Sequence, residues 1–197
     1  MWPLLLLSVI SLSVVLERLI FFIREGRVDY SRVLNEMLNL VKASSVSRAV
    51  DLGKSNSAVI PRIIAQGLES TSLNFDESVS NACSEELGRY EEGLPILDTA
   101  ITLAPLLGLL GTVTGMIKSF GLLGASELEA PMAITGGIAE ALIATAFGLG
   151  IAICALIPFN LLQTRKEKFL REVETKASIF SIHLKQIENQ KGSSKAA

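Results

Sequence analysis

Three long apolar blocks alternate with charged segments along this chain. The blocks cover residues 2–23, 94–120 and 132–162. The first would be about 33 Å long as a helix, enough to cross a hydrocarbon core of about 30 Å. The second has no charge between Asp98 and Lys118, and the third has only Glu140. The pattern therefore predicts an all-α membrane protein with three transmembrane helices.

Outside these blocks, the spacing of apolar residues predicts amphipathic helices. Leu34, Met37 and Val41 recur at three- and four-residue intervals. A charged helix that begins at Asn74 or Asp76 is expected to continue through Gly93 and Pro95 into the second block. In the tail, a seam with nearly heptad spacing favours packing against another helix, either from residues 30–92 of the same chain or from a neighbouring subunit. The seam consists of Phe169, Val173, Ala177, Phe180, Leu184 and Ile187.

The basic residues predict the orientation. The segment between the first two blocks holds eight Lys and Arg residues, the tail holds eight more, and the short loop at 121–131 holds none. Because basic residues gather on the cytoplasmic side, the N-terminus and this loop are expected outside and the C-terminus inside. The expected parts are transmembrane helix 1 (1–23), a cytoplasmic helical segment (24–93), transmembrane helix 2 (94–120), a short periplasmic loop (121–131), transmembrane helix 3 (132–162), and a cytoplasmic amphipathic helix with a disordered tail (163–197).

Glu140 is the main candidate for chemistry. It is the only charge between Ala130 and Gln163. A charged residue at the middle of a membrane helix costs roughly 2.5–3.5 kcal/mol to insert, so a polar partner or a moving proton is expected to meet it. Small residues surround it, and these allow close helix packing in lipid.

Two threonines extend this candidate site. Thr112 and Thr145 lie among the small residues of the second and third blocks. Their hydroxyls either bond backbone carbonyls at a helix contact or line a polar path. Asp98, Thr102 and Asn160 are accessory polar candidates along the same two blocks.

The net charge, the cysteines and the single histidine argue against several classes of function. Hydrophobic residues make up 49% of the chain, and the formal net charge is −2 with no basic, aromatic-interleaved patch of the kind that binds nucleic acid. Cys83 is expected in the cytoplasmic segment and Cys154 in the third transmembrane helix, so no disulfide is expected. The single histidine, His183, lies in the tail, which argues against an intramembrane hydrolase. No enzyme activity, metal or cofactor is expected.

Two stretches carry a resemblance to a known family. Leu103–Phe120 reads LAPLLGLLGTVTGMIKSF, and Gly137–Leu149 reads GIAEALIATAFGL. These resemble the two signature blocks of the MotA/TolQ/ExbB proton channel family, with the ExbB/TolQ branch a better match than the four-span flagellar branch. The chain departs from the usual Val-Ala-Pro-Gly at Ile134–Gly137, and Pro158 is displaced from the usual proline position.

The resemblance implies a homopentamer around a pair of single-span partner helices, each with a membrane aspartate. Thr112 and Thr145 match threonines that face the pore, and Glu140 matches the membrane glutamate. The implied function is an inner-membrane motor subunit that works with ExbD- and TonB-like partners. It would use the proton motive force to energise outer-membrane import of siderophores or cobalamin. Two alternatives stay open: a TolQ-like subunit of the Tol-Pal envelope system, and a passive membrane scaffold.

Overall fold

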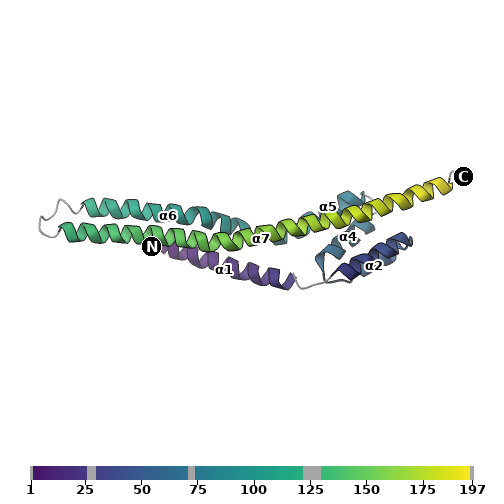
Figure 1. The fold of residues 1–197 in the computed structure, drawn as a ribbon, viewed down its shortest axis with the longest axis horizontal. Helices are drawn as coiled ribbons and strands as arrows, with labels where there is room; N and C mark the ends of the chain where they lie inside the picture. The colour runs from purple at the N-terminus through teal and green to yellow at the C-terminus, as the bar shows by residue number, and fades with distance from the viewer. Residues whose placement is uncertain (1, 26–29, 71–73, 122–129, 196–197) are drawn as a thin grey trace. The chain divides into compact units, whose positions relative to one another are not determined.

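The computed structural model describes residues 2–25, 30–70, 74–121 and 130–195. Within these ranges the regular structure is entirely helical (Figure 1). The order is α1 (Trp2–Glu25), α2 (Ser31–Lys42), α3 (Val46–Lys54), α4 (Val59–Glu69), α5 (Phe75–Glu91), α6 (Leu94–Gly121) and α7 (Ala130–Lys195). The all-α prediction is confirmed, and three described helices are long and apolar enough to cross a membrane. Most of the predicted loop at 121–131 lies outside the described residues.

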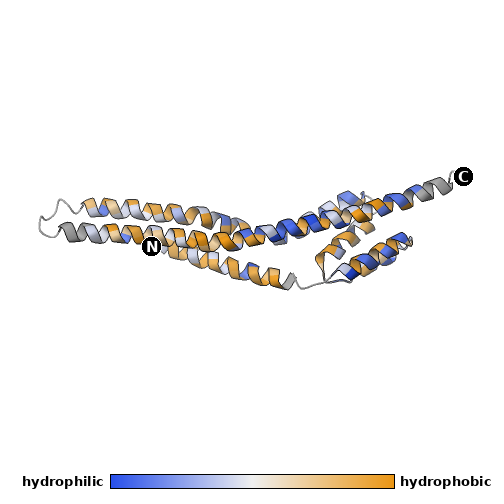
Figure 2. Cartoon of the chain, viewed as in Figure 1, coloured by the Kyte–Doolittle hydropathy of each residue, from blue (hydrophilic) through white to orange (hydrophobic). Residues whose placement is uncertain are grey.

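The chain divides into two compact units. Unit 1 consists of residues 1–21 and 93–163, and unit 2 consists of residues 22–92 and 164–197. Unit 1 holds most of α1, all of α6 and the first part of α7. Unit 2 holds α2 to α5 and the second part of α7. Hydrophobic residues dominate the unit 1 helices, whereas hydrophilic stretches alternate with hydrophobic ones in unit 2 (Figure 2).

Unit 1 brings α6 alongside the first part of α7 (Figure 1). Side chains on the outside of these helices are large and apolar: Leu106, Phe147 and Ile157 are each 61% exposed. The side chains buried between the helices are small, with Ala104 fully buried and Ala141 3% exposed. This reversal of the soluble pattern suits helices that are surrounded by lipid.

Unit 2 has an ordinary apolar core. Met37, Val41, Ile63 and Ile64 are fully buried, and Phe180 is 2% exposed. The seam predicted along the tail is buried from Phe169 to Phe180, while Leu184 and Ile187 are half-buried. The ring of Phe169 stacks on Tyr90, with 4.2 Å between the ring centroids. The seam therefore packs against the same chain.

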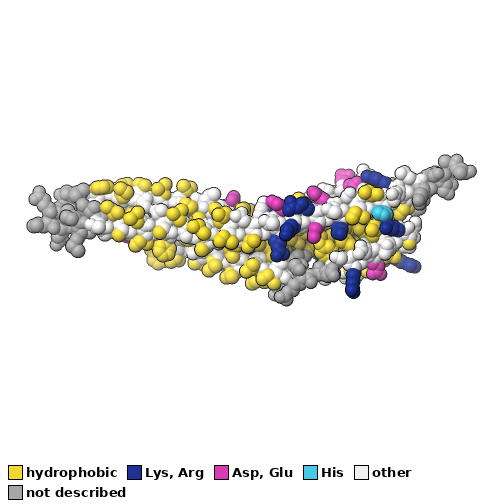
Figure 3. Space-filling model, viewed as in Figure 1, with side chains coloured by type: hydrophobic (Ala, Val, Ile, Leu, Met, Phe, Trp, Pro, Cys, Tyr) yellow, Lys and Arg dark blue, Asp and Glu magenta, His cyan; other side chains and the backbone are white. Residues whose placement is uncertain are grey.

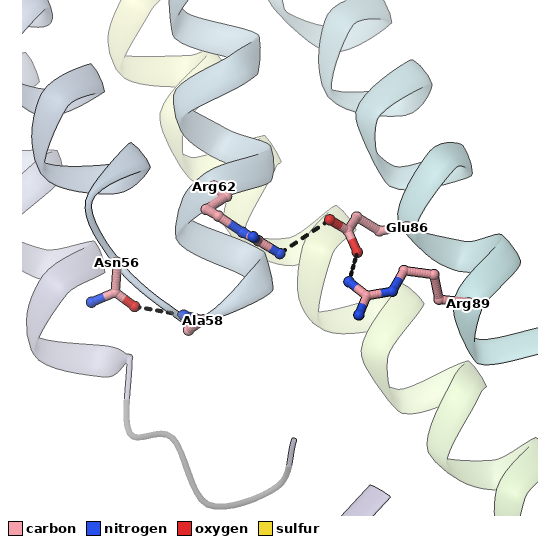
Figure 4. A network of polar contacts seen from close by, with 5 residues as sticks. All are labelled: Asn56, Ala58, Arg62, Glu86 and Arg89. Carbon is pink, nitrogen blue, oxygen red and sulfur yellow. Dashed lines mark hydrogen bonds and ion pairs between the residues drawn. The ribbon is translucent and has the colours of Figure 1, made fainter. Parts of the chain in front are cut away.

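Polar contacts join the helices of unit 2 at their surface. Glu86 on α5 lies between two arginines (Figure 4). Its carboxylate accepts bonds from Arg62 on α4 at 3.1 Å and from Arg89 at 3.0 Å. Just before α4, the Asn56 side chain accepts a hydrogen bond from the Ala58 backbone N–H at 2.8 Å. The Arg62–Glu86 pair thus joins α4 to α5, and the Asn56 bond closes the turn before α4.

The expected continuous helix through Gly93 is wrong. α5 ends at Glu91, Glu92 takes an extended ψ of 134°, and Gly93 has a φ of +76°. Only glycine adopts such a positive φ without strain. A Cβ at Gly93 would also lie 2.8 Å from Cγ1 of Val14. The helix is therefore interrupted at Glu92 and Gly93.

Candidate functional site

The contact between α6 and α7 is built from glycine and alanine. A Cβ placed on Gly111 would lie 2.7 Å from Cβ of Ala144, and one on Gly115 would lie 2.7 Å from Cβ of Ala141. Because higher numbers on α6 face lower numbers on α7, the two helices are antiparallel. Any larger side chain along this strip would force the helices apart, so the small residues set their distance.

Thr145 bonds across this contact. Its hydroxyl donates a hydrogen bond to the Gly108 carbonyl on α6, with an oxygen–oxygen distance of 3.0 Å. The Thr112 hydroxyl donates to the Leu109 carbonyl of its own helix at 2.7 Å. Gly108 and Leu109 are consecutive residues, so the two hydroxyls lie at neighbouring carbonyls on the same edge of the contact. Each hydroxyl oxygen keeps lone pairs that can accept a further bond.

These bonds can be compared with the two interpretations of the threonines, a helix contact or a polar path lined by their hydroxyls. Bonding to backbone carbonyls is what a helix contact predicts, and the Thr145 bond does join two helices. Thr114 and Thr99, by comparison, bond only carbonyls of their own helix. The side chains of Thr112 and Thr145 are only half-buried, so the helix contact does not enclose them.

Glu140 lies on the other edge of the same contact. It precedes Ala144 by one helical turn, and Ala144 faces Gly111 rather than Gly108. At 100° per residue, Glu140 projects about 140° around α7 from Thr145 and lies about 7.5 Å along the axis from it. Its side chain is exposed. A single chain therefore does not bring the carboxylate together with the two hydroxyls.

The accessory candidates lie toward the opposite end of α6. Asp98 is exposed, and the Thr102 hydroxyl bonds the Asp98 and Thr99 carbonyls at 3.2 and 3.0 Å. Asp98 precedes Gly108 by ten residues, about 15 Å along the helix. Asn160 is exposed on α7. The described structure does not bring these groups to Glu140.

One buried cation was not singled out from the sequence. The side chain of Arg18 on α1 is 5% exposed and pairs with Glu17 at 2.9 Å. Its guanidinium lies 5.4 Å from the centre of the Phe21 ring. The sequence signal is the charged pair that interrupts the end of the first apolar block. Arg18 lies beside Gly93, where α6 begins.

These features are those of a membrane protein with three membrane-length helices that pack through small residues. Its membrane-length helices also carry an exposed carboxylate, Glu140, and two half-buried hydroxyls, those of Thr112 and Thr145. A sequence profile of the MotA/TolQ/ExbB proton channel family matches residues 55–175. The match covers more than half of the chain, and the chain belongs to this family.

Relatives from both named branches are similar to the chain. ExbB-like protein 1 of Synechocystis sp. is 38% identical over 172 residues, which cover 82% of this chain and 66% of that protein. The biopolymer transport protein ExbB of Neisseria meningitidis is 29% identical over 208 residues, covering 96% of this chain and 90% of its own length. The Tol-Pal system protein TolQ of Pseudomonas aeruginosa is 40% identical over 99 residues, covering 50% and 43%.

Proposed function

We propose that the chain is the pore-forming subunit of an inner-membrane, proton-driven motor of the ExbB type. With ExbD- and TonB-like partners, it would convert inward proton flow into motion that energises import across the outer membrane. Its imported cargo would be siderophores or cobalamin. Membership of a proton channel family and two relatives with biopolymer-transport names support this proposal.

The arrangement of Thr112, Thr145 and Glu140 carries the proposal. The two hydroxyls lie at consecutive carbonyls beside the helix contact, and they retain acceptor lone pairs for a proton-bearing group. Glu140 is an exposed carboxylate in an apolar helix, a group that is costly against lipid and is typical of proton relays. The site needs another helix to complete it, because one chain leaves the carboxylate and the hydroxyls on different edges.

A homopentamer around the partner's single-span helices would supply that completion. The membrane aspartate of the partner would approach the Thr112 and Thr145 hydroxyls, while Glu140 would face a neighbouring polar group or the proton entry. In the proposed orientation, residues 24–93 and the tail are cytoplasmic. Force would then leave through the partner, and each proton would supply about 2.3 kcal/mol per 100 mV of membrane potential.

A TolQ-like role is the second candidate, supported by the 40% identity to TolQ over half of the chain. The two roles differ in the process that fails when the protein is absent. Deletion would abolish siderophore or cobalamin uptake for the ExbB role, whereas it would produce detergent sensitivity and chained cells for the Tol-Pal role. Loss of envelope integrity with normal uptake would overturn the ExbB assignment.

Variants at Glu140 separate the motor from a passive scaffold. Glu140→Ala removes the carboxylate, and Glu140→Gln keeps the size but cannot titrate. The matched control is Leu142→Ala, which changes an exposed apolar residue two positions away. We expect assembly with partners in all three variants and energised uptake only in the control. Wild-type uptake with Glu140→Ala would contradict a motor role for this residue and favour the scaffold.

A further inference from the structure

A cavity of about 440 Å³ lies within unit 2, outside the site described above. Its walls come from the end of α1, Tyr30 just before α2, the start of α4, the end of α5 and the part of α7 that belongs to unit 2. One wall is aromatic: Phe22 meets the edge of Tyr90 at 5.6 Å between ring centroids, and Tyr90 stacks on Phe169. The cavity thus has a fixed apolar side that its own chain does not fill.

The other wall is basic. Arg165 and Lys168 on α7 line the cavity, and neither has an ion-pair partner among the residues that the structure describes. The basic residues beside them differ: Lys166 pairs with Glu91 at 3.3 Å, and Arg171 pairs with Glu167 at 3.8 Å. Lys and Arg side chains gather over this part of α7 (Figure 3). Arg165 and Lys168, which line the cavity, are therefore available to bind a ligand.

The acid in the cavity wall does not neutralise them. Glu172 lines the cavity, but its carboxylate accepts a hydrogen bond from the Tyr30 hydroxyl. The cavity is lined by two positive side chains and one negative side chain, so its net charge is positive. A negatively charged group with several acceptor oxygens fits this wall, because Arg and Lys bind phosphate through charge-assisted hydrogen bonds.

The sequence position of these walls points to the membrane surface. Phe22 directly follows the α1 residues of unit 1, and Arg165 follows the last α7 residue of unit 1 by two positions. Phe22 lies in the last turn of the first apolar block, and Arg165 lies in the first turn after the third. Both are therefore at the end of a membrane-length apolar stretch, near the level at which lipid phosphates lie. Basic residues placed there attract anionic lipid.

We propose that this cavity binds a phosphate group, with the Arg165 and Lys168 side chains as its ligands and the Phe22–Tyr90–Phe169 stack against the apolar part of the same molecule. The phosphodiester headgroup of an anionic phospholipid combines both features. A soluble phosphate ester is the other source of the same chemistry. This site is independent of the proposed proton path, since none of its residues belongs to unit 1.

The test uses the full chain, purified in detergent and mixed with phosphatidylglycerol or phosphatidylcholine, with bound lipid counted by native mass spectrometry. The variant is Arg165→Gln with Lys168→Gln. The matched control is Arg171→Gln with Lys176→Gln, which removes the same charge from the same helix outside the cavity. Thermal unfolding of each variant checks that the fold is kept.

We expect the cavity variant to bind phosphatidylglycerol roughly tenfold or more weakly, because two charge-assisted bonds are lost, and the control to change less than about twofold. Equal loss in both variants, or no loss in the cavity variant, would overturn the site. Inorganic phosphate and glycerol 3-phosphate form the second arm. If they bind the wild type but not the cavity variant, and phosphatidylglycerol does not compete, the ligand is a soluble phosphate rather than a lipid. Absence of binding by every one of these probes rules out a phosphate site.

Discussion

The two halves of α7 show how the same helix is stabilised in two different surroundings. In unit 1 the residues that α7 buries from Ala141 to Ala155 are small, with these two at 3% and 2% exposure, and the large apolar residues of the same stretch point outward. In unit 2 its buried residues are large, such as Phe169 and Phe180, and charged residues cover the outside. In water, burying large apolar groups drives folding. In lipid that force is absent between helices, and close backbone approach through small residues replaces it.

The largest effect predicted from this comparison is at Gly148. A Cβ there would lie 2.5 Å from the Ala104 carbonyl oxygen and 3.1 Å from Cα of Gly108. Gly148→Leu should therefore separate α6 from α7 and abolish recovery of folded protein from the membrane. Gly150→Leu is the control on the same helix, because a Cβ at Gly150 has nothing within 4 Å. The yield of monodisperse protein in detergent is the measurement, and equal yields for both variants would contradict the small-residue contact.

A second prediction concerns the large-residue core of unit 2. Phe180→Ala should lower the free energy of unfolding of this unit by about 3–5 kcal/mol, because the fully packed ring leaves a cavity. Ile182→Ala, at a side chain that is 53% exposed, should cost under about 1 kcal/mol. Unfolding by urea, followed by the helical circular dichroism signal, compares the two. A similar cost at both positions would mean that the tail seam is not a core.

The sequence was sufficient to predict the long apolar helices, but not how the candidate site residues come together. Apolar block length predicts a transmembrane helix, and the heptad-like spacing correctly predicted the buried residues from Phe169 to Phe180. The break at Gly93 was missed because a single glycine between helical patterns is compatible with either a turn or a continuous helix. The contact with α1 leaves no room for a Cβ at Gly93, since Val14 and Arg18 lie where a Cβ would point, and sequence spacing does not reveal that contact.

The placement of Glu140 shows a different limit. Helical periodicity alone separates it from Thr145 by about 140° around the helix axis. Which edge faces which neighbour depends on the packing of α6 on α7, which the Thr145–Gly108 bond and the contact of Gly111 with Ala144 reveal. Sequence spacing identifies the polar residues, whereas the interhelical contact determines which of them share an edge.

A smaller effect is expected at Cys83 in unit 2. Burial raises the pKa of this thiol above its ordinary value, and the negative charge of Glu174 raises it further. At pH 8 a smaller fraction is therefore thiolate than for an exposed cysteine, and labelling by maleimide should be several-fold slower and should keep rising with pH into the alkaline range. The comparison is Ser84→Cys in a Cys83→Ala background, at an exposed neighbouring position. Equal labelling rates over the same pH series would show that Cys83 is not shielded by α7.

The most direct test of the proton-path account is proton flux through the subunit reconstituted in liposomes with its ExbD-like partner under an imposed membrane potential. Thr145→Val keeps the shape of the side chain but removes the hydroxyl that bonds Gly108, and Thr114→Val removes a hydroxyl that bonds only its own helix. The account predicts that flux is lost with Thr145→Val, and with Glu140→Gln, while the Thr114→Val complex conducts like the wild type. Undiminished flux in the Thr145→Val and Glu140→Gln complexes would contradict it.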